Sequence, residues 1–499
     1  MNVLIISQFV WKTHLGTALE LAQCLLDQGH EVVILGCDGS VGSCYTNQSG
    51  NLKICRRCSQ LREYGLSLLD GPVEYCKISD FRPPQYDEIE IAREIEENVT
   101  DLSSLERFVY DGCKLGLGIA SSLITESRNP NVDRTDLWSC MPTRLQASVY
   151  TYESVRQFLE VQASFDRAYL FNGRFDITNA ALNACRNVEG MVTFTHERGA
   201  STDKYMTFEG ATPHDRNYLY KHAVSFWDNC DDHAEREFLA NEFFNRRILG
   251  ADRSWKNFLE HQKKDSLPEE FDANRRNVVI FNSSEDEFVG LGPEWKNPIY
   301  ESQSHGVEQI ICDALLQFPD VHFYLRMHPN LNSVDNEDTQ RLRRLADEGL
   351  QNFTYIAPDS HVSSYALLNA ADTVLTFGST IGIEATYGGK VSILAGHAFY
   401  ELFDVTHQAR DHGDVMRLLG DETLAPKSKR EALIYGYYLV NRGVDFKYWE
   451  ADGFLNGSFK GQCLTLPKSV KRVSYLRQFE RKLRVHFKAL KSRFNLFSS

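Results

Sequence analysis

The sequence predicts an α/β protein of two Rossmann-like, doubly wound domains that face a cleft, with a helical insertion and a C-terminal amphipathic helix. Three observations support this prediction. The chain has 499 residues, which is too long for one hydrophobic core. Short apolar runs alternate with segments of helical period in two separate regions, and a polar stretch divides them. Contents of 42% hydrophobic and 24% charged residues are those of an ordinary globular protein.

Residues 1–270 are predicted to form the first domain, and its opening reads as a β-α-β unit of a parallel sheet. Two apolar runs, NVLIIS and HEVVILG, flank a segment of helical period. The loop after the first run, SQFVWKTHLG, lacks the G-x-G-x-x-G pattern, so we expect no dinucleotide site there. This loop contains His14, a candidate for contact with an acceptor substrate.

A helical insertion is predicted over residues 81–165, which include the acidic run YDEIEIAREIEENVTDLSSLERF. The alternation then resumes with the strand RAYLFNG, a helix and the strand MVTFTHE. Helical, charged sequence continues to about residue 265. The insertion is therefore expected to interrupt the sheet of the first domain without ending it.

A second domain is predicted for residues 277–430. A polar segment with a proline, KKDSLPEEFDANRRN, reads as the linker that precedes it. Apolar runs and helical segments then alternate from VVIFNSS to KVSILAG. Ligands of such sheets bind at the carboxyl ends of the strands, so the loops that follow these runs are the places to search.

The last predicted unit, residues 431–499, consists of helices and ends in a basic amphipathic segment. Between Lys468 and Arg493 there are ten Lys or Arg residues and one acidic residue, with apolar side chains every three or four positions. Residues 468–494 therefore suit an anionic membrane surface. The alternative is a helix docked on its own protein, with the basic face in water.

Charge and hydropathy limit which classes of partner and which cellular locations are expected. The formal net charge of −14 argues against a nucleic-acid partner. The N-terminus resembles a strand more than a signal peptide, and no run of apolar residues is long enough to span a membrane. We therefore expect a cytoplasmic protein, bound peripherally to the inner face of the membrane where the basic segment engages it.

Four of the twelve cysteines, Cys37, Cys44, Cys55 and Cys58, follow the second predicted strand. The C-x2-C pair is expected to form a tight knuckle, and nearby glycines allow turns, so the set suits a tetrahedral thiolate site. Structural zinc is the predicted ligand; an iron–sulfur cluster, or no metal, are the alternatives. Disulfides are disfavoured in a reducing compartment. Other cysteines in helical runs are predicted to be core residues: Cys24, Cys185 and Cys312.

Four loops of the second domain carry polar side chains after predicted strands. One of them, TFGSTIGIEATYGGK, leads into a helix, whose dipole and unpaired N–H groups favour a phosphate. His328, at another strand end, is a catalytic candidate that donates to the phosphate as it leaves. Ordinary turn and capping chemistry is the alternative for each loop. The donor-binding candidates are Ser283, Ser284, Arg326, His328, Pro329, Gly378, Ser379, Thr380 and Glu384.

The segment RMHP, followed some fifty residues later by TFGSTIGIEATYGGKVSIL, resembles the donor half of GT-B glycosyltransferases. The resemblance is to the capsule and lipopolysaccharide biosynthesis group, which is similar to bacterial sialyl- and Kdo-transferases and CDP-glycerol polymerases. It covers residues 277–400 well and the first half of the chain weakly. It implies that nucleotide phosphate and sugar are bound by His328, Pro329, Ser379, Thr380 and Glu384.

Two strand ends of the first domain, in LFNGRF and HERG, supply the remaining candidates. The CMP-sugar transferases of the group that this chain resembles have a motif with two acidic residues, which supplies the catalytic base. The segment HERG has only one acidic residue. Glu197 is the predicted base and His196 the second candidate; a surface pair of Glu197 with Arg198 is the alternative. Asn172 and Arg174 are acceptor-side candidates. Arg174 either binds a carboxylate or phosphate with two hydrogen bonds or forms a structural salt bridge.

The resemblance implies a glycosyltransferase that moves a sugar from a nucleotide-activated donor to a surface polysaccharide or a lipid-linked glycan. A CMP-linked acidic sugar is the favoured donor. No catalytic metal is expected, and Asp38, Asp133 and Asp136 form no D-x-D motif. Two alternatives stay open: a polyol-phosphate transferase that uses a CDP-alcohol, and a non-catalytic glycan-binding or scaffold protein. A UDP-sugar 2-epimerase would not need the long inserts or the basic tail.

Overall fold

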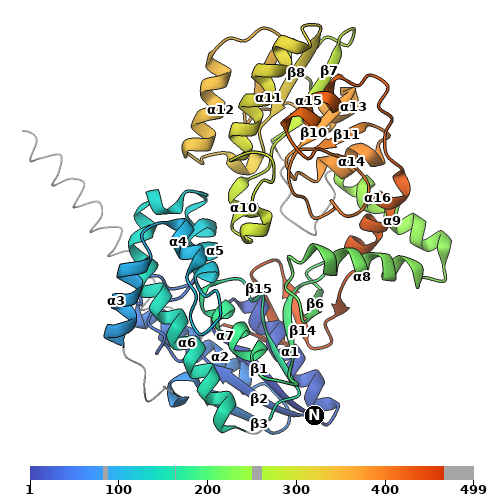
Figure 1. Cartoon of the computed structure of the whole chain (residues 1–499). Coiled ribbons are helices and arrows are strands. Elements are labelled where there is room, and N and C mark those ends of the chain that lie inside the picture. The colour runs from blue at the N-terminus through green and yellow to red at the C-terminus, as the bar shows by residue number, and fades with distance from the viewer. Residues whose placement is uncertain (82–87, 163, 250–260, 466–499) are drawn as a thin grey trace, which may run out of the picture.

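The computed structural model describes residues 1–81, 88–162, 164–249 and 261–465 (Figure 1). Two separate sheets with parallel cores form the framework, and helices pack around each. The predicted α/β class with two Rossmann-like domains is therefore confirmed. The basic segment 468–494 lies outside the described residues. In the part of the chain that is described, no helix has the length and apolar character needed to cross a membrane.

The first sheet has the strand order β13-β6-β5-β4-β1-β2-β3. Its five central strands are parallel in the Rossmann order β3-β2-β1-β4-β5, whereas β6 and β13 extend it as antiparallel neighbours. The strands are β1 (Asn2–Ser7), β2 (Glu31–Gly36), β3 (Val73–Lys77), β4 (Arg167–Phe171), β5 (Val192–Arg198), β6 (Lys204–Glu209) and β13 (Val444–Asp445).

The second sheet has the order β12-β11-β10-β7-β8-β9, and every neighbouring pair is parallel. This is again the Rossmann order, with its switch point between β7 and β10. Central strands are apolar on both faces, as burial between helices requires. The strands are β7 (Arg276–Phe281), β8 (Val321–Arg326), β9 (Phe353–Ile356), β10 (Thr373–Thr376), β11 (Val391–Leu394) and β12 (His407–Gln408).

The first part of the chain contains nine α-helices in the described residues, four of them in the predicted insertion between β3 and β4. They are α1 (Lys12–Asp27), α2 (Leu52–Leu66), α3 (Glu88–Asn98), α4 (Leu102–Arg107), α5 (Gly116–Ser127), α6 (Met141–Val161), α7 (Asp176–Arg186), α8 (Arg216–Asp228) and α9 (His233–Ile248). Short 3-10 helices join them: η1 (Ile78–Phe81), η2 (Val132–Arg134) and η3 (Asp136–Cys140).

The second sheet is accompanied by a further set of helices that alternate with its strands. They are α10 (Glu285–Val289), η4 (Pro293–Trp295), α11 (Gln303–Gln317), η5 (Pro329–Leu331), α12 (Glu337–Asp347), α13 (Ser364–Ala370), α14 (Ile381–Tyr387), α15 (His412–Gly420) and α16 (Lys429–Asn441). Helices α8, α9 and α16 share one apolar cluster with β6 and α14, so this cluster links the two domains.

Three local predictions are wrong. Residues 204–209, expected to be helical, form β6, because pairing with the edge of β5 overrides local preference. Cys55 and Cys58 lie on helix α2 and not in a tight knuckle. Cys312 is exposed on α11, whereas Cys185 is buried as expected and Cys24 is half-buried.

The C-terminal unit also differs from its prediction of helices alone. After α16 the chain forms β13 and then a three-stranded sheet of β14 (Trp449–Asp452), β15 (Asn456–Phe459) and β16 (Gln462–Cys463). Trp449 is buried against α1 at Gly16. A Cβ atom at position 16 would lie 2.4 Å from the Trp449 ring, so a larger residue would leave the ring no room. The carboxylate of Glu20, also buried, accepts backbone N–H groups from Lys447, Tyr448 and Trp449. These tertiary contacts hold the returning chain against the first domain.

The carboxyl ends of the two sheets face each other. Helix α10, which follows β7, lies between the domains near α5 (Figure 1). Arg174, just after β4, donates to the carbonyl oxygen of Gly290 at the end of α10, at 3.0 Å. From the end of α5, Arg128 donates to the carbonyl oxygen of Asn330, at 2.8 Å. The predicted binding loops of both domains therefore lie on facing sides.

Candidate active site between two Rossmann-like domains

Three predicted donor loops meet at the switch point of the second sheet. The side-chain oxygen of Asn282, after β7, accepts the backbone N–H of His328, after β8, at 2.8 Å. Ser283 donates its hydroxyl to the carbonyl oxygen of Phe377, after β10, at 3.2 Å. These bonds hold the ends of three strands together, at the edge where open α/β sheets bind ligands.

His328 is a neutral hydrogen-bond donor in this arrangement. Its Nδ1 accepts the backbone N–H of Asn330 at 3.2 Å, which assigns the ring proton to Nε2. Burial, assisted by Arg326 and Arg128, lowers the pKa of His328 to about 4. At neutral pH the ring is therefore uncharged, with Nε2–H as its one donor.

Arg128 reaches this site from the first domain and was not predicted. Its guanidinium donates to the hydroxyl of Ser284 at 3.2 Å and lies 3.7 Å from the carboxylate of Asp286. The residue ends α5 in a left-handed conformation, with φ of 55°, which turns the chain toward the second domain. Nothing in its local sequence, ESRNPN, signals this contact, because the partner is 156 residues away.

Arg326, predicted to contact the donor, is almost completely buried. Its side chain donates to the carbonyl oxygens of Met327 and Ala357, between the ends of β8 and β9. Two of its N–H groups, at Nε and Nη2, have no partner within the described chain. Burial lowers the pKa of Arg326 to about 10, so it remains a cation at neutral pH. It therefore adds positive charge behind His328.

The loop after β10 is held by groups that the sequence did not reveal. Thr380 accepts a hydrogen bond from Arg247 of α9 at 2.8 Å. The buried carboxylate of Glu384 accepts from Arg247 at 2.8 Å and from the hydroxyl of Tyr365 at 2.7 Å. Both oxygens of Glu384 are thus engaged by protein groups. Its predicted contact with a nucleotide would have to replace or extend them.

Gly378 begins this loop with φ of 116°, a conformation that side chains rarely adopt. A Cβ atom there would lie 2.6 Å from the carbonyl oxygen of His397 and 2.7 Å from the ring of Phe288. The hydroxyl oxygen of Ser379, the next residue, accepts the backbone N–H of Ile381 at 3.4 Å. The glycine predicted from the sequence is therefore required by close packing.

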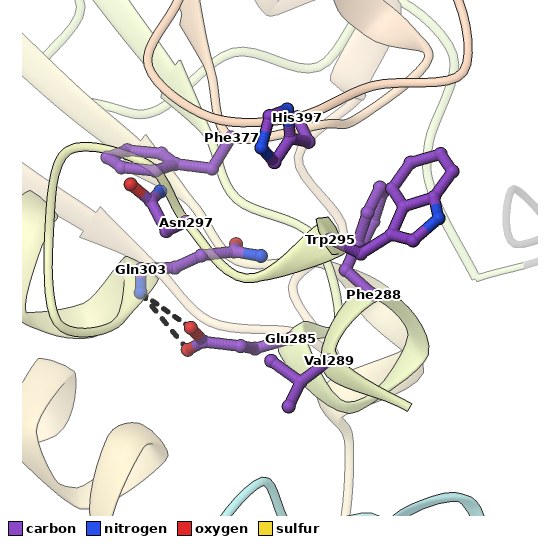
Figure 2. Close-up of a pocket in the computed structure, with 8 residues that line it drawn as sticks. All are labelled: Glu285, Phe288, Val289, Trp295, Asn297, Gln303, Phe377 and His397. Atoms are coloured by element: carbon purple, nitrogen blue, oxygen red, sulfur yellow. Dashed lines mark hydrogen bonds between the residues drawn. The ribbon is translucent and has the colours of Figure 1, made fainter. Parts of the chain in front are cut away.

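A pocket adjoins these loops and is drawn in Figure 2. Glu285 accepts the backbone N–H of Gln303 at 3.0 and 3.1 Å, and Gln303 in turn bonds Ser283. Burial, with a smaller effect of Asp338, raises the pKa of Glu285 to about 8. Aromatic rings form much of the wall opposite this carboxyl, and sequence patterns did not single them out. The lining residues are Glu285, Phe288, Val289, Trp295, Asn297, Gln303, Phe377 and His397.

The acceptor-side candidates come together at the switch point of the first sheet. Asn172, in a left-handed conformation after β4, donates to Glu197 of β5 at 2.8 Å. The other carboxylate oxygen of Glu197 accepts the backbone N–H of Arg198 at 3.1 Å and lies 3.7 Å from Nε2 of His14. His14 lies on the first turn of α1, so three elements position one carboxylate.

His14 and His196 line a second pocket at the same switch point. Burial, with a smaller effect of Arg198, lowers the pKa of His14 to about 3; burial and then His14 lower the pKa of His196 to about 3. Both rings are therefore neutral at physiological pH. Nδ1 of His196 is buried without a partner in the described chain. The ring of Phe171 packs against His14 at 3.8 Å between centroids.

Arg174 and Arg198 lie near this pocket, and the contacts of their side chains differ from the salt bridges considered as alternatives. The side chain of Arg198 donates to the carbonyl oxygen of Phe454 at 2.6 Å, and the described ion pairs include none between it and Glu197. Arg174 bonds neutral groups, including the hydroxyl of Ser121 at 3.2 Å, and its guanidinium lies 4.2 Å from the ring of Phe175. Among the described contacts of Arg174 there is no salt bridge.

Cys37, Cys44, Cys55 and Cys58 line a third pocket of the first domain. The first two are buried, and the other two are half-buried. No group of three or more His, Cys, Asp or Glu side chains within the described residues has an arrangement that would hold a metal ion.

Two sheets in Rossmann order, with facing carboxyl ends and polar loops at both switch points, define a two-domain α/β protein of the GT-B type. Residues 259–418 match the family described as "Capsule polysaccharide biosynthesis protein". This match confirms the resemblance predicted for residues 277–400. No curated protein matches the chain.

Solved structures of several enzymes are similar to this chain. KpsC beta Kdo 2,4 transferase of Thermosulfurimonas dismutans is 12% identical, with 55% of this chain and 79% of that chain covered and a TM-score of 0.37. KpsC beta Kdo 2,7 transferase of the same organism is 14% identical, with 61% and 88% covered and a TM-score of 0.35. UDP-GlcNAc 2-epimerase of Neisseria meningitidis is 11% identical, with 88% and 98% covered and a TM-score of 0.28.

Proposed function

We propose that the protein is a glycosyltransferase of capsule polysaccharide biosynthesis that transfers a sugar from a CMP-linked acidic donor to a surface or lipid-linked glycan. The observation that supports this proposal is that two cations, Arg128 and Arg326, lie close enough to His328 to affect its pKa, at the switch point of the matched domain. Such a set favours an anionic phosphate at the carboxyl edge of the sheet.

The second domain would act on the leaving group. As the bond between the anomeric carbon and the phosphate oxygen breaks, negative charge grows on the nucleotide phosphate. In this proposal Nε2–H of His328 donates to that oxygen, and the guanidinium of Arg128, which bonds Ser284 of the neighbouring loop, adds positive charge. Preorganised donors of this kind lower the barrier without a metal ion, so the proposed chemistry is metal-independent.

The first domain would act on the acceptor. Its hydroxyl oxygen attacks the anomeric carbon as its proton leaves. His14 lines the pocket, and Glu197 lies 3.7 Å from its Nε2. We therefore retain Glu197 as the base and assign His14 to carry the proton from the pocket to that carboxylate. His196, in the same pocket, is the alternative carrier.

A nucleotide panel tests the donor assignment. Stabilisation in a thermal-shift assay by CMP, and not by UDP or GDP, is the expected result. Release of CMP from a CMP-linked acidic sugar, in the presence of a glycan acceptor and without added divalent cation, would then establish transfer. Turnover of CDP-glycerol or CDP-ribitol would instead indicate a polyol-phosphate transferase. A chain that responds to no nucleotide would contradict the proposal.

Variants separate the two half-sites. His328→Ala should lower kcat about 10²–10³-fold, as expected when one transition-state donor is removed. Exposed His233 offers a matched control, and His233→Ala should leave kcat unchanged.

Glu197→Gln should lower kcat while CMP still stabilises the fold. Glu209→Gln, on the exposed end of the adjoining strand β6, is its control. Normal turnover by His328→Ala would refute the donor assignment.

A further inference from the structure

Helix α2 begins with an exposed surface that the chemistry proposed above does not use. Its buried residues are Leu61, Arg62 and Gly65, and all three belong to the second half of the helix. The first two turns, by contrast, contain no buried residue. Packing on the first domain therefore holds the end of α2, and its beginning is open to other contacts.

Three cationic side chains share one face of these two turns. Lys53, Arg56 and Arg57 are all exposed, and spacings of three and four residues place them together on the helix. Within the described residues none of the three forms an ion pair with an Asp or Glu. The first turn of α2 also contains no acidic residue. Because the helix dipole favours anions at this end, the three cations do not serve the stability of the helix.

Two large apolar side chains flank this cationic face. Leu52 is 73% exposed and Ile54 is 44% exposed, on either side of Lys53 in the first turn. We call the five residues Leu52, Lys53, Ile54, Arg56 and Arg57 the α2 patch. Exposed aliphatic and cationic side chains on one short helical surface are typical of segments that lie on a membrane, where aliphatic groups enter the headgroup region and cations meet lipid phosphates.

The distribution of charge decides which partner the α2 patch fits. The whole chain has a formal net charge of −14, so an anionic surface attracts this patch and repels most of the remaining molecule. The C-terminal segment 468–494 is itself basic and is therefore repelled by the patch. Charge complementarity thus favours an anionic lipid surface over this segment of the same chain.

We propose that the α2 patch docks the protein on an anionic membrane surface. Lys53, Arg56 and Arg57 contact lipid phosphates, and Leu52 and Ile54 enter the headgroup region beside them. The contact needs no change in the fold, because all five side chains are already exposed. It is a second membrane contact, separate from the one expected for residues 468–494.

The α2 patch lies at the acceptor side of the first domain. Helix α2 follows β2 and so begins at the carboxyl edge of the sheet, which also carries the pocket of His14. Ile54 lines the third pocket, and Gln8 and Phe9 line both that pocket and the pocket of His14. Docking would hold this edge next to the membrane. Delivery of a lipid-linked acceptor there rests on the proposed function, whereas docking itself does not.

Sedimentation of the full chain with lipid vesicles tests the proposal. Wild type should bind vesicles of phosphatidylcholine and phosphatidylglycerol, less so as salt is added, and should bind phosphatidylcholine alone much more weakly. The test variant carries Lys53→Gln, Arg56→Gln and Arg57→Gln. Each Lys or Arg beside an anionic leaflet raises affinity about fivefold, so this variant should bind the anionic vesicles about 10²-fold more weakly.

A matched control removes the same charges from another surface. Lys264, Arg343 and Arg344 are exposed, and they are again one lysine and two arginines. Lys264→Gln, Arg343→Gln and Arg344→Gln together should leave vesicle binding close to that of wild type. A second test variant, Leu52→Ser with Ile54→Ser, should also weaken binding. Its salt dependence should stay that of wild type, because no charge is removed.

Three results would overturn the assignment. Wild type that stays in the supernatant with anionic vesicles would exclude membrane docking. Equal binding by the charge variant and its control would assign the vesicle contact to another surface, such as residues 468–494. A charge variant that binds vesicles like its control but changes oligomeric state in light scattering would assign the α2 patch to a second copy of the chain. No nucleotide or glycan is present in these assays, so their result is independent of the transferase proposal.

Discussion

Replacement of Arg144 by methionine should destabilise the first domain severely. Arg144, on α6, is fully buried and donates to Asp176 of α7 at 2.6 Å and to Glu126 of α5 at 2.8 Å. Asp176 has no exposed side-chain area, and Glu126 has 8%. The arginine therefore joins three helices through two carboxylates that water scarcely reaches. The loop with Asn172 and Arg174 leads into α7, so the acceptor-side candidates depend on this contact.

The expected size follows from the charges left behind. Removing one partner of a buried ion pair costs about 3–5 kcal/mol, because an unpaired charge stays buried. Here two carboxylates would lose one shared cation. Glu126 can escape part of the penalty by taking up a proton, since burial already raises its pKa to about 7. We therefore expect Arg144→Met to lower the free energy of unfolding by about 3–5 kcal/mol. Twice that loss is not expected, although two carboxylates lose their partner.

The sign of the pH dependence follows from Glu126. Its pKa in the folded chain lies above its ordinary value of 4.5, so the stability it contributes is present below pH 4.5 and lost as the pH rises through about 7. Without Arg144 the loss should be smallest at low pH and grow toward neutral pH, because an unpaired buried carboxyl is stable only when protonated.

Urea denaturation of wild type and variant, followed by tryptophan fluorescence at pH 5 and pH 8, measures both effects. Arg156→Met is the matched control. Arg156 also pairs with two carboxylates on α6, but it is 42% exposed, so the change should stay below about 1 kcal/mol. An Arg144→Met variant no less stable than this control would refute the reasoning.

Three further changes have separate causes. Gly378→Ala should cost at least about 1–3 kcal/mol of stability, measured by denaturation, because it strains the backbone at φ of 116° and places a methyl against the ring of Phe288. Glu285→Gln should flatten the fall in Tm between pH 4.5 and about 8, because the wild-type carboxyl has a raised pKa and stabilises only when protonated. Trp449→Ala should cost about 3–5 kcal/mol in urea denaturation, because Trp449 is only 3% exposed.

Each of these predictions has an outcome that contradicts it. An alanine at position 378 with wild-type stability would show that the loop adjusts freely. Parallel Tm curves for Glu285→Gln and wild type across this pH range would show that the carboxyl is ionised throughout. If Trp449→Ala unfolds like wild type, the C-terminal strands contribute nothing to the first domain. Leu455→Ala, an exposed side chain of the same hairpin, is the control for that measurement.

Local patterns in the sequence were sufficient for most elements of the two sheets. The runs NVLIIS and VVIFNSS became β1 and β7, because a strand buried on both faces must be continuously apolar. Loops after such strands lie at one edge of a parallel sheet, which is why the loop after β7 bonds both His328, after β8, and Phe377, after β10. The strands β6 and β13 were missed because an edge strand is defined by the neighbour that it pairs with.

The sequence by itself determined the two-domain α/β class and the strand ends at which polar side chains gather, since hydrophobic period and turn residues act over a few positions. Only the tertiary structure decided which cationic side chains contact the loops at those strand ends. Arg128 and Arg247 meet their partners across 156 and 137 residues, and Arg62 is buried without a carboxylate partner in the described chain. A charge is recognised locally, but its partner depends on how distant elements pack, which no periodicity encodes.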